Sequence, residues 1–410
     1  MRRREFVASA AAAGALGAMP ALAAQAGKNG QRKKIAAIST TYHVRSHSDN
    51  FITRFLEGWW INDKYTPPPF DVVSLYMDQI HPADIGHRLS AAYGFPVTKS
   101  IEEALTLGTG KLAVDGVLLI AEHGNYPFND RQQHLYPRFE FYKQVTDVYR
   151  KSKRSAPIFV DKHLSYDWTK AKTMYDLSRE LKFPLMAGSS VSVTFRRPEL
   201  DPPLGVEFDD AIMLGGGWVT DGGIFHDLET LQAFVERRKG GETGIRAVEY
   251  LKGPAVWKAA EEKRWSKELM QAALGRAEKL GQGRPEDVKA PVACLLEYND
   301  GFKASVVALG GLVSEYLVAY RRKGSKEIES TSCYVPTQNS NNFSALTDAI
   351  AHMIETGKRL YPVERTLLTT GALQQLMESS FQGGKRIETP MLKVRYSAPA
   401  KSYYMHGMGS

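Results

Sequence analysis

The densest group of ligand-type side chains in the sequence follows a continuous apolar run at residues 114–120. This segment, 121–127, reads Ala-Glu-His-Gly-Asn-Tyr-Pro and combines an acid, an imidazole, an amide and a phenol. Acids and histidines exchange protons, and amides and phenols hydrogen-bond to polar ligands. A loop that only connects two elements seldom carries so many of these groups. We therefore predict a ligand site that includes Glu122, His123 and Asn125.

Two later segments carry groups suited to proton transfer. Lys162 follows the apolar run 158–160. A lysine held against apolar walls has a lowered pKa and can act as a general acid or base on a hydroxyl or carbonyl. His226 and Glu229 stand three residues apart after the glycine-rich turn at 215–217, which places both on one helical face. This pair can share a proton, bind sugar hydroxyls or hold a metal. A purely structural role is the alternative for each residue.

The loop at residues 40–49 follows the first apolar run and lacks the Gly-x-Gly-x-x-Gly pattern that brings a backbone close to a pyrophosphate. It offers other phosphate-binding groups instead. These are a helix start near Asn50 and the side chains of Thr40, Thr41 and Arg45. A surface loop whose polar residues only cap the helix is the equal alternative.

Asp78 ends the second strand region, where an acid can bind a ribose diol.

The elements that must position these loops alternate between strands and helices. Continuous apolar or alternating runs predict strands at 35–39, 70–76, 114–120, 158–160 and 185–187. Helices are predicted between them, at 51–60, 82–93, 100–105, 132–150 and 168–181. This order predicts a doubly wound parallel sheet covered on both faces. Ligands of such sheets bind at the carboxyl ends of the strands, where the candidate residues lie.

The pattern changes from about residue 191 to alternating strands. Asn-Asp-Gly at 299–301, between runs 293–298 and 302–308, predicts a hairpin. Two helices, at 343–356 and 363–380, precede a closing strand at 392–396, so an α+β domain is expected. The expected organisation is a signal peptide 1–26, a linker 27–34, a Rossmann-like nucleotide-binding domain 35–190, an α+β substrate and oligomerisation domain 191–396 and a tail 397–410.

Composition excludes several classes of protein. The chain has 410 residues, of which 43% are hydrophobic and 24% charged, so it is not disordered, collagenous or coiled-coil. Its two cysteines allow neither a disulfide framework nor a four-cysteine zinc site. The net charge of +8 is spread along the chain without interleaved aromatics, which argues against a nucleic-acid partner. Beyond the N-terminus no apolar run approaches the length of about 20 residues that crosses a bilayer, so no membrane anchoring is expected.

The N-terminus has the pattern of an export signal. Arg3 and Arg4 precede an Ala/Gly-rich stretch that ends near residue 26. The arginine pair and the mildly apolar stretch resemble a twin-arginine signal, and an ordinary secretory signal is the alternative. We expect an exported, periplasmic protein. Because twin-arginine export carries folded proteins, such a chain can acquire a cofactor in the cytosol and retain it.

The order of strands and four short motifs resemble the Gfo/Idh/MocA family, named after glucose-fructose oxidoreductase, inositol dehydrogenase and MocA. The motifs are the segment 114–126, the step Asp161-Lys162, the run Gly-Gly-Ile-Phe-His-x-x-Glu at 222–229, and the closing-helix segments 342–350 and 361–365. The resemblance implies an N-terminal Rossmann domain that holds NAD or NADP. It also implies a C-terminal α+β domain, built on an open antiparallel sheet, that covers a sugar site and makes the contacts of a homo-oligomer.

The resemblance also implies roles for individual residues. The family's Glu-Lys-Pro motif carries a catalytic lysine onto Lys162. Its Asp-x-x-x-His pair carries a proton-transfer histidine onto His226. The substrate-orienting acid of that pair corresponds to Asp221, five residues before the histidine, while Gly222 stands at the family spacing of four. Glu229 matches an acidic position three residues after the histidine.

These observations predict an exported oxidoreductase that acts on a secondary hydroxyl of a sugar or polyol with a tightly bound NAD or NADP. Thr40, Thr41, Arg45, Asp78, Glu122, His123 and Asn125 would hold the cofactor, and Lys162, His226, Asp221 and Glu229 would do the chemistry. One alternative is a non-redox sugar lyase, hydrolase or epimerase, either metal-free or with a metal on His226, Glu229 and His123. Another is a catalytically silent sugar-binding scaffold. The missing glycine motif favours both alternatives.

Overall fold

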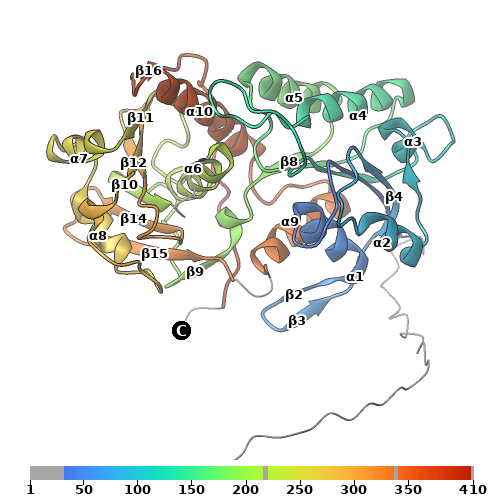
Figure 1. Cartoon of the computed structure of the whole chain (residues 1–410), viewed down its shortest axis with the longest axis horizontal. Helices are drawn as coiled ribbons and strands as arrows, with labels where there is room; N and C mark the ends of the chain where they lie inside the picture. The colour runs from blue at the N-terminus through green and yellow to red at the C-terminus, as the bar shows by residue number, and fades with distance from the viewer. Residues whose placement is uncertain (1–31, 216–219, 337–339, 408–410) are drawn as a thin grey trace, which may run out of the picture.

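The computed structural model describes residues 32–215, 220–336 and 340–407 (Figure 1). The expected signal peptide and most of the glycine-rich turn at 215–217 lie outside these ranges. Among the residues described, no helix combines the length and apolar character needed to cross a membrane.

The first sheet has six parallel strands in the order β5-β4-β1-β6-β7-β8. The order in which strands are added to the sheet reverses at β1: β4 and β5 are added on one side of it, and β6, β7 and β8 on the other. The carboxyl ends of β1 and β6 therefore frame the crevice in which such folds bind ligands. The predicted Rossmann-like sheet is therefore confirmed. Its strands are β1 (Lys34–Ser39), β4 (Asp71–Met77), β5 (Val97–Thr98), β6 (Gly116–Ile120), β7 (Ile158–Asp161) and β8 (Leu185–Gly188).

Helices cover both faces of this sheet (Figure 1). The crossover helices α3 (Ile101–Thr106), α4 (Arg138–Ser152) and α5 (Trp168–Glu180) share a core with alternate residues of the strands on one face. Helix α2 (Gly86–Tyr93) follows β4. The other face packs against α9 (Asn342–Thr356), whose Phe343 and Ile350 join the core around Phe51 and Phe159. A helix late in the sequence thus completes the first domain.

The helix predicted over 51–60 is shorter in the structure. A π-helical turn at Asp49–Thr53 continues into α1 (Arg54–Glu57), which ends at Gly58. Gly58 has φ +86°, which favours glycine. A hairpin of β2 (Trp59–Ile61) and β3 (Lys64–Thr66) follows. The expected phosphate site at a helix start near Asn50 therefore lacks a long helix behind it.

The second sheet has eight strands in the order β16-β11-β12-β13-β10-β14-β15-β9. Every pairing is antiparallel except that of β10 with β13, so the sheet is mixed. The predicted hairpin is confirmed as β12 and β13. The bounds are β9 (Phe195–Arg197), β10 (Phe208–Gly215), β11 (Ile245–Lys252), β12 (Val292–Tyr298), β13 (Lys303–Ala308), β14 (Leu317–Arg322), β15 (Ile328–Tyr334) and β16 (Ile387–Glu388).

Helices lie on both faces of the second sheet as well. One face packs against α6 (Asp221–Val235) and α10 (Val363–Phe381), and the other against α7 (Pro254–Glu261) and α8 (Lys267–Leu274). Helix α10 also contacts α5 and β8, so it joins the two sheets. Cys294 and Cys333 are both buried and free.

The closing strand predicted at 392–396 is not formed. The two-residue β16 takes the edge of the sheet beside β11, and within 392–396 Tyr396 forms an isolated β-bridge with Glu242. Leu392, Val394 and Tyr396 instead pack into the core from a loop. Their alternation with charged residues therefore reflects alternate burial without a continuous strand.

Candidate active site

A pocket of about 350 Å³ opens at the carboxyl edge of the first sheet. It lies between the loops after β6 and β7 and the start of α6. Its lining includes five of the predicted residues, namely Glu122, His123, Lys162, Asp221 and His226. Parallel strands end at one edge, which explains why residues far apart in sequence meet here.

Lys162 is held at the pocket by a buried acid. Its backbone has φ +63°, and its Nζ lies 3.0 Å from Oε1 of Glu122. The other carboxylate oxygen of Glu122 accepts a hydrogen bond from Arg138, whose side chain is fully buried. Burial opposes the charge of Glu122, but Lys162 and Arg138 outweigh it and hold the pKa of this carboxyl well below its usual range. Glu122 is therefore an anion that orients two cations.

Gly222 lies beside this ion pair. A Cβ atom on Gly222 would lie 3.5 Å from Nζ of Lys162 and 4.0 Å from Oε1 of Glu122. The resemblance expects an acid at this position of the helix. Glu122, from the loop after β6, occupies the neighbouring space and supplies the carboxylate that faces Lys162.

His226 lies on the first turns of α6. Its Nδ1 is 2.6 Å from the hydroxyl oxygen of Ser189, which follows β8. Burial, with the nearby charge of Lys162, lowers the pKa of His226 well below its usual range. The neutral imidazole is the form that accepts a proton. His226 can therefore accept a proton in its neutral form, and its burial makes it a weaker base than a solvent-exposed histidine.

Asp221 begins α6 and is fixed by two backbone amides. Its carboxylate accepts hydrogen bonds from the N–H groups of His134 and Gly222, at 2.9 and 2.7 Å. Burial raises the pKa of Asp221 despite these bonds. The structure therefore places the acid in the pocket wall, where it links α6 to the loop before α4.

The structure places Glu229 away from the pocket, although it is three residues from His226. Its carboxylate is fully buried and accepts hydrogen bonds from the hydroxyls of Thr366 and Thr369 on α10, at 2.7 and 2.6 Å. Three residues advance a helix by about 300°, which is 60° short of a full turn. The side chain of Glu229 therefore points about 60° away from that of His226, toward α10. Burial raises the pKa of Glu229 to about 7. This geometry corrects the expectation that Glu229 shares the reaction site.

The raised pKa of Glu229 makes stability depend on pH. The folded chain keeps this proton up to about pH 7, whereas an unfolded carboxyl loses it near 4.5. The free energy of unfolding should therefore fall by about 3 kcal/mol as pH rises through this interval. Glu229→Gln should remove this fall, as measured by urea unfolding below and above the interval. The control is Glu261→Gln, at an exposed site. Equal pH slopes for Glu229→Gln and the unmodified chain would contradict the assignment.

A second pocket, of about 560 Å³, adjoins the first and shares His123 and Tyr136 with it. It lies between the loops after β1, β4 and β6, at the point where the strand order reverses. Thr41 and Asn125 line it, as does His123. Among the described residues, neither the Oγ1 of Thr41 nor the Nε2 of His123 has a hydrogen-bond partner, although both atoms are buried. Such atoms point to a polar ligand that supplies the missing partner.

Two other predicted cofactor residues already have protein partners. Thr40 is fully buried and donates its hydroxyl to the backbone oxygen of Glu122, at 2.7 Å. Asp78 accepts hydrogen bonds from the phenols of Tyr76 and Tyr126, at 3.0 and 2.5 Å. Thr40 therefore joins the loop after β1 to the loop after β6. The two phenols bind the carboxylate of Asp78, which was expected to bind a ribose.

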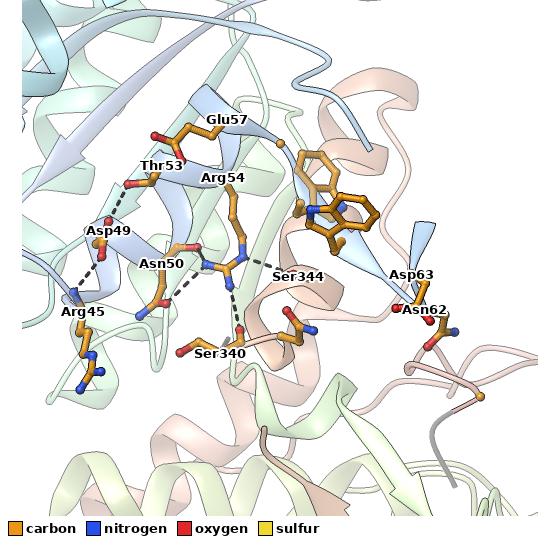
Figure 2. Close-up of a pocket in the computed structure, with 15 residues that line it drawn as sticks. Arg45, Asp49, Asn50, Thr53, Arg54, Glu57, Asn62, Asp63, Ser340 and Ser344 are labelled. Carbon is orange, nitrogen blue, oxygen red and sulfur yellow. Dashed lines mark hydrogen bonds between the residues drawn. The ribbon is translucent and has the colours of Figure 1, made fainter. Parts of the chain in front are cut away.

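Arg45 lines a different and larger cavity, of about 880 Å³ (Figure 2). There Asp49 lies between the backbone of Arg45 and the hydroxyl of Thr53, and Arg54 reaches across to Ser340. The structure thus separates Arg45 from the two pockets of the candidate site.

The alternative metal trio of His226, Glu229 and His123 is not brought together, because Glu229 turns toward α10. Within the described ranges, no three His, Cys, Asp or Glu side chains gather closely enough to hold a metal ion.

No family model and no curated protein matches the sequence. Solved structures do match the fold. GenD2 from gentamicin A biosynthesis, in complex with NAD, matches with a TM-score of 0.55 at 13% identity, over 90% of this chain and 99% of that one. A myo-inositol dehydrogenase from Corynebacterium glutamicum matches with a TM-score of 0.51 at 12% identity, over 87% of this chain and 99% of that one.

A Gfo/Idh/MocA family oxidoreductase from Vibrio cholerae matches with a TM-score of 0.50 at 13% identity, over 86% of this chain and 97% of that one. The chain shares the fold of these three structures. The fold expected from the short motifs is therefore confirmed across nearly the whole described chain. Within this fold, the pocket of Lys162 and His226 lies where the two domains meet.

Proposed function

We propose that this chain is an oxidoreductase that removes or returns the hydrogen of a secondary hydroxyl on a sugar or polyol, with a tightly held NAD or NADP. One observation carries the proposal. A lysine and a neutral histidine from different domains face one pocket beside a second pocket at the strand-order reversal. Structures with this fold include an NAD complex and a myo-inositol dehydrogenase, which supports the same reaction class.

The residues of the second pocket fit a dinucleotide. Thr41 and His123 offer unpartnered polar atoms there, and Asn125 and Gln79 line the same pocket. These side chains would hold the cofactor where the glycine-rich backbone is missing. When bound, the nicotinamide supplies an acceptor or donor for hydride.

The chain's own residues handle the proton. The neutral His226 accepts the proton of the substrate hydroxyl, and Ser189 fixes its ring through Nδ1. The charge of Lys162, oriented by Glu122, stabilises the negative charge that develops on the substrate oxygen. In the reverse direction the same two groups return the proton to a carbonyl.

The pocket walls suit a sugar ring. Phe128, Tyr136 and Tyr316 line it with flat apolar faces. Asp221 adds a carboxylate on the α6 side. Flat apolar faces with a few fixed polar groups suit a ring that is apolar on its C–H faces and polar at its rim.

A second candidate function is a metal-free sugar lyase, hydrolase or epimerase that uses the same acid and base groups. The bonds of Asp78 to Tyr76 and Tyr126 favour it, because they engage the carboxylate expected to bind a ribose.

We further propose twin-arginine export, on the sequence of residues 1–26, and a homo-oligomer. A reporter fused to residues 1–26 should lose export when Arg3 and Arg4 become Lys, and gel filtration tests the oligomer.

A panel of sugars and polyols distinguishes the two functions. The proposal expects at least one compound to reduce the bound nicotinamide, seen by absorbance, with a matching carbonyl product by mass spectrometry. A converted sugar with no change in redox state would support the second candidate and contradict the first.

A further inference from the structure

Three stacked aromatic rings run along one wall of the pocket that holds Lys162 and His226. The ring centre of Tyr136 lies 4.0 Å from that of His134, which in turn lies 4.2 Å from that of Phe128. All three residues line the pocket, and we call them the aromatic ladder. This wall therefore offers more contact surface than the groups that handle the proton require.

The aromatic ladder leads from the buried reaction groups to the surface. At its inner end Tyr136 is 8% exposed, and its ring centre lies 5.0 Å from the guanidinium carbon of Arg138. Arg138 binds Glu122, which is also the partner of Lys162. At the outer end Phe128 is 55% exposed. A ligand that begins at Lys162 and follows the ladder therefore reaches solvent at Phe128.

The loop fixes Phe128 in this exposed position. Phe128 and His134 form an isolated antiparallel bridge, and the backbone N–H of His134 donates to Asp221 at 2.9 Å. The side-chain oxygen of Asn129 accepts hydrogen bonds from the N–H groups two and four residues further on, both at 3.0 Å. His134 covers one face of the Phe128 ring, so the exposed area is the opposite face and the edges. A single exposed apolar side chain is ordinary, but one held in a stack at the rim of a pocket indicates a ligand-binding groove.

The charges near Phe128 favour a neutral ligand at the outer end. Arg131 is the one lysine or arginine in the segment 121–137, and its guanidinium already pairs with Glu378 on α10. An anionic extension of the ligand, such as a diphosphate, would find no unpaired lysine or arginine in this segment. A second sugar ring fits better, because its C–H face is apolar and flat like the ring of Phe128.

We propose that the pocket takes a glycosidically linked sugar. Its reacting unit lies at Lys162 and His226, and its next unit stacks on the open face of Phe128. The inference rests on the proposed function in placing the reacting unit, and it adds an outer subsite. Phe128 is then a specificity-determining residue that favours linked sugars over free monosaccharides and polyols.

The test measures binding, so it does not require turnover. Dissociation constants of cellobiose, maltose and N,N′-diacetylchitobiose are compared with that of D-glucose by isothermal titration calorimetry. At least one disaccharide should bind about three- to tenfold more tightly than D-glucose. In Phe128→Ala this ratio should fall toward one, whereas Phe128→Tyr, which keeps a flat ring, should retain it. Circular dichroism confirms that both variants are folded.

Phe381→Ala is the matched control. Phe381 is 56% exposed and lies 5.4 Å from Arg131 of the same loop, but it does not line the pocket. The control should keep the ratio of the unmodified chain. A panel in which no disaccharide binds more tightly than D-glucose would overturn the outer subsite, as would a ratio that folded Phe128→Ala leaves intact. A disaccharide that binds through Phe128 without reducing the nicotinamide would instead count against the oxidoreductase assignment alone.

Discussion

Lys162→Met is expected to lower kcat by about 10²–10³-fold while the protein stays folded and keeps its dinucleotide. Methionine has a similar length but carries no charge to stabilise the substrate oxygen. Glu122 keeps Arg138 as a partner in the variant, so its carboxylate is not left isolated. The measurement is single-turnover reduction of the bound nicotinamide by a reactive sugar or polyol.

The matched control for this variant is Lys172→Met on α5. Lys172 is 45% exposed and pairs with Asp176 on the same helix, away from the pocket residues. It should retain the rate of the unmodified chain. A rate for Lys162→Met within about twofold of that control would contradict the role assigned to Lys162.

Arg138→Met is expected to lower the free energy of unfolding by about 3–5 kcal/mol. Arg138 is fully buried, and its guanidinium contacts both Glu122 and Nε2 of His163, the latter at 3.2 Å. Its removal leaves a buried carboxylate with Lys162 as its one ion-pair partner. Urea unfolding measures the loss.

The control lies on the same helix. Arg150 forms a surface ion pair with Glu180 at 2.9 Å, with exposed fractions of 40% and 57%. Arg150→Met should cost no more than about 1 kcal/mol. Arg138→Met combined with Glu122→Gln should cost less than the sum of the two single changes, because the two substitutions remove the two sides of one contact. Equal losses for Arg138→Met and Arg150→Met would contradict a buried ion network.

The sequence predicts the first sheet well because each of its central strands is a continuous apolar run followed by a polar loop. Local patterns are less informative at residues 51–60, where Gly58 ends the helix. They also mislead at 392–396, where alternate side chains pack into the core without forming a strand. The position of α9 against the first sheet depends on tertiary packing, which periodicity does not report.

Residue type and position after a strand single out Glu122 and Lys162, whereas His226 is singled out by its spacing to Glu229 and by the family resemblance. Arg138 and Ser189 have no comparable signal in the sequence, since an arginine on a helix and a serine in a loop are usually solvated. One weak signal was available. Arg138 is the first residue of α4, where the helix dipole disfavours a cation. A basic residue there suggests a nearby anion, but only the fold shows that it is Glu122.

The central claim is tested most directly by asking whether the purified protein holds NAD or NADP in its second pocket. The full chain would be expressed, purified and denatured, and the released small molecules would be identified by absorbance and mass spectrometry. We predict a near-stoichiometric yield of NAD or NADP, and a thermal shift when the same dinucleotide is added back to the emptied protein. No released dinucleotide, together with no thermal shift on adding either one, would contradict the oxidoreductase assignment.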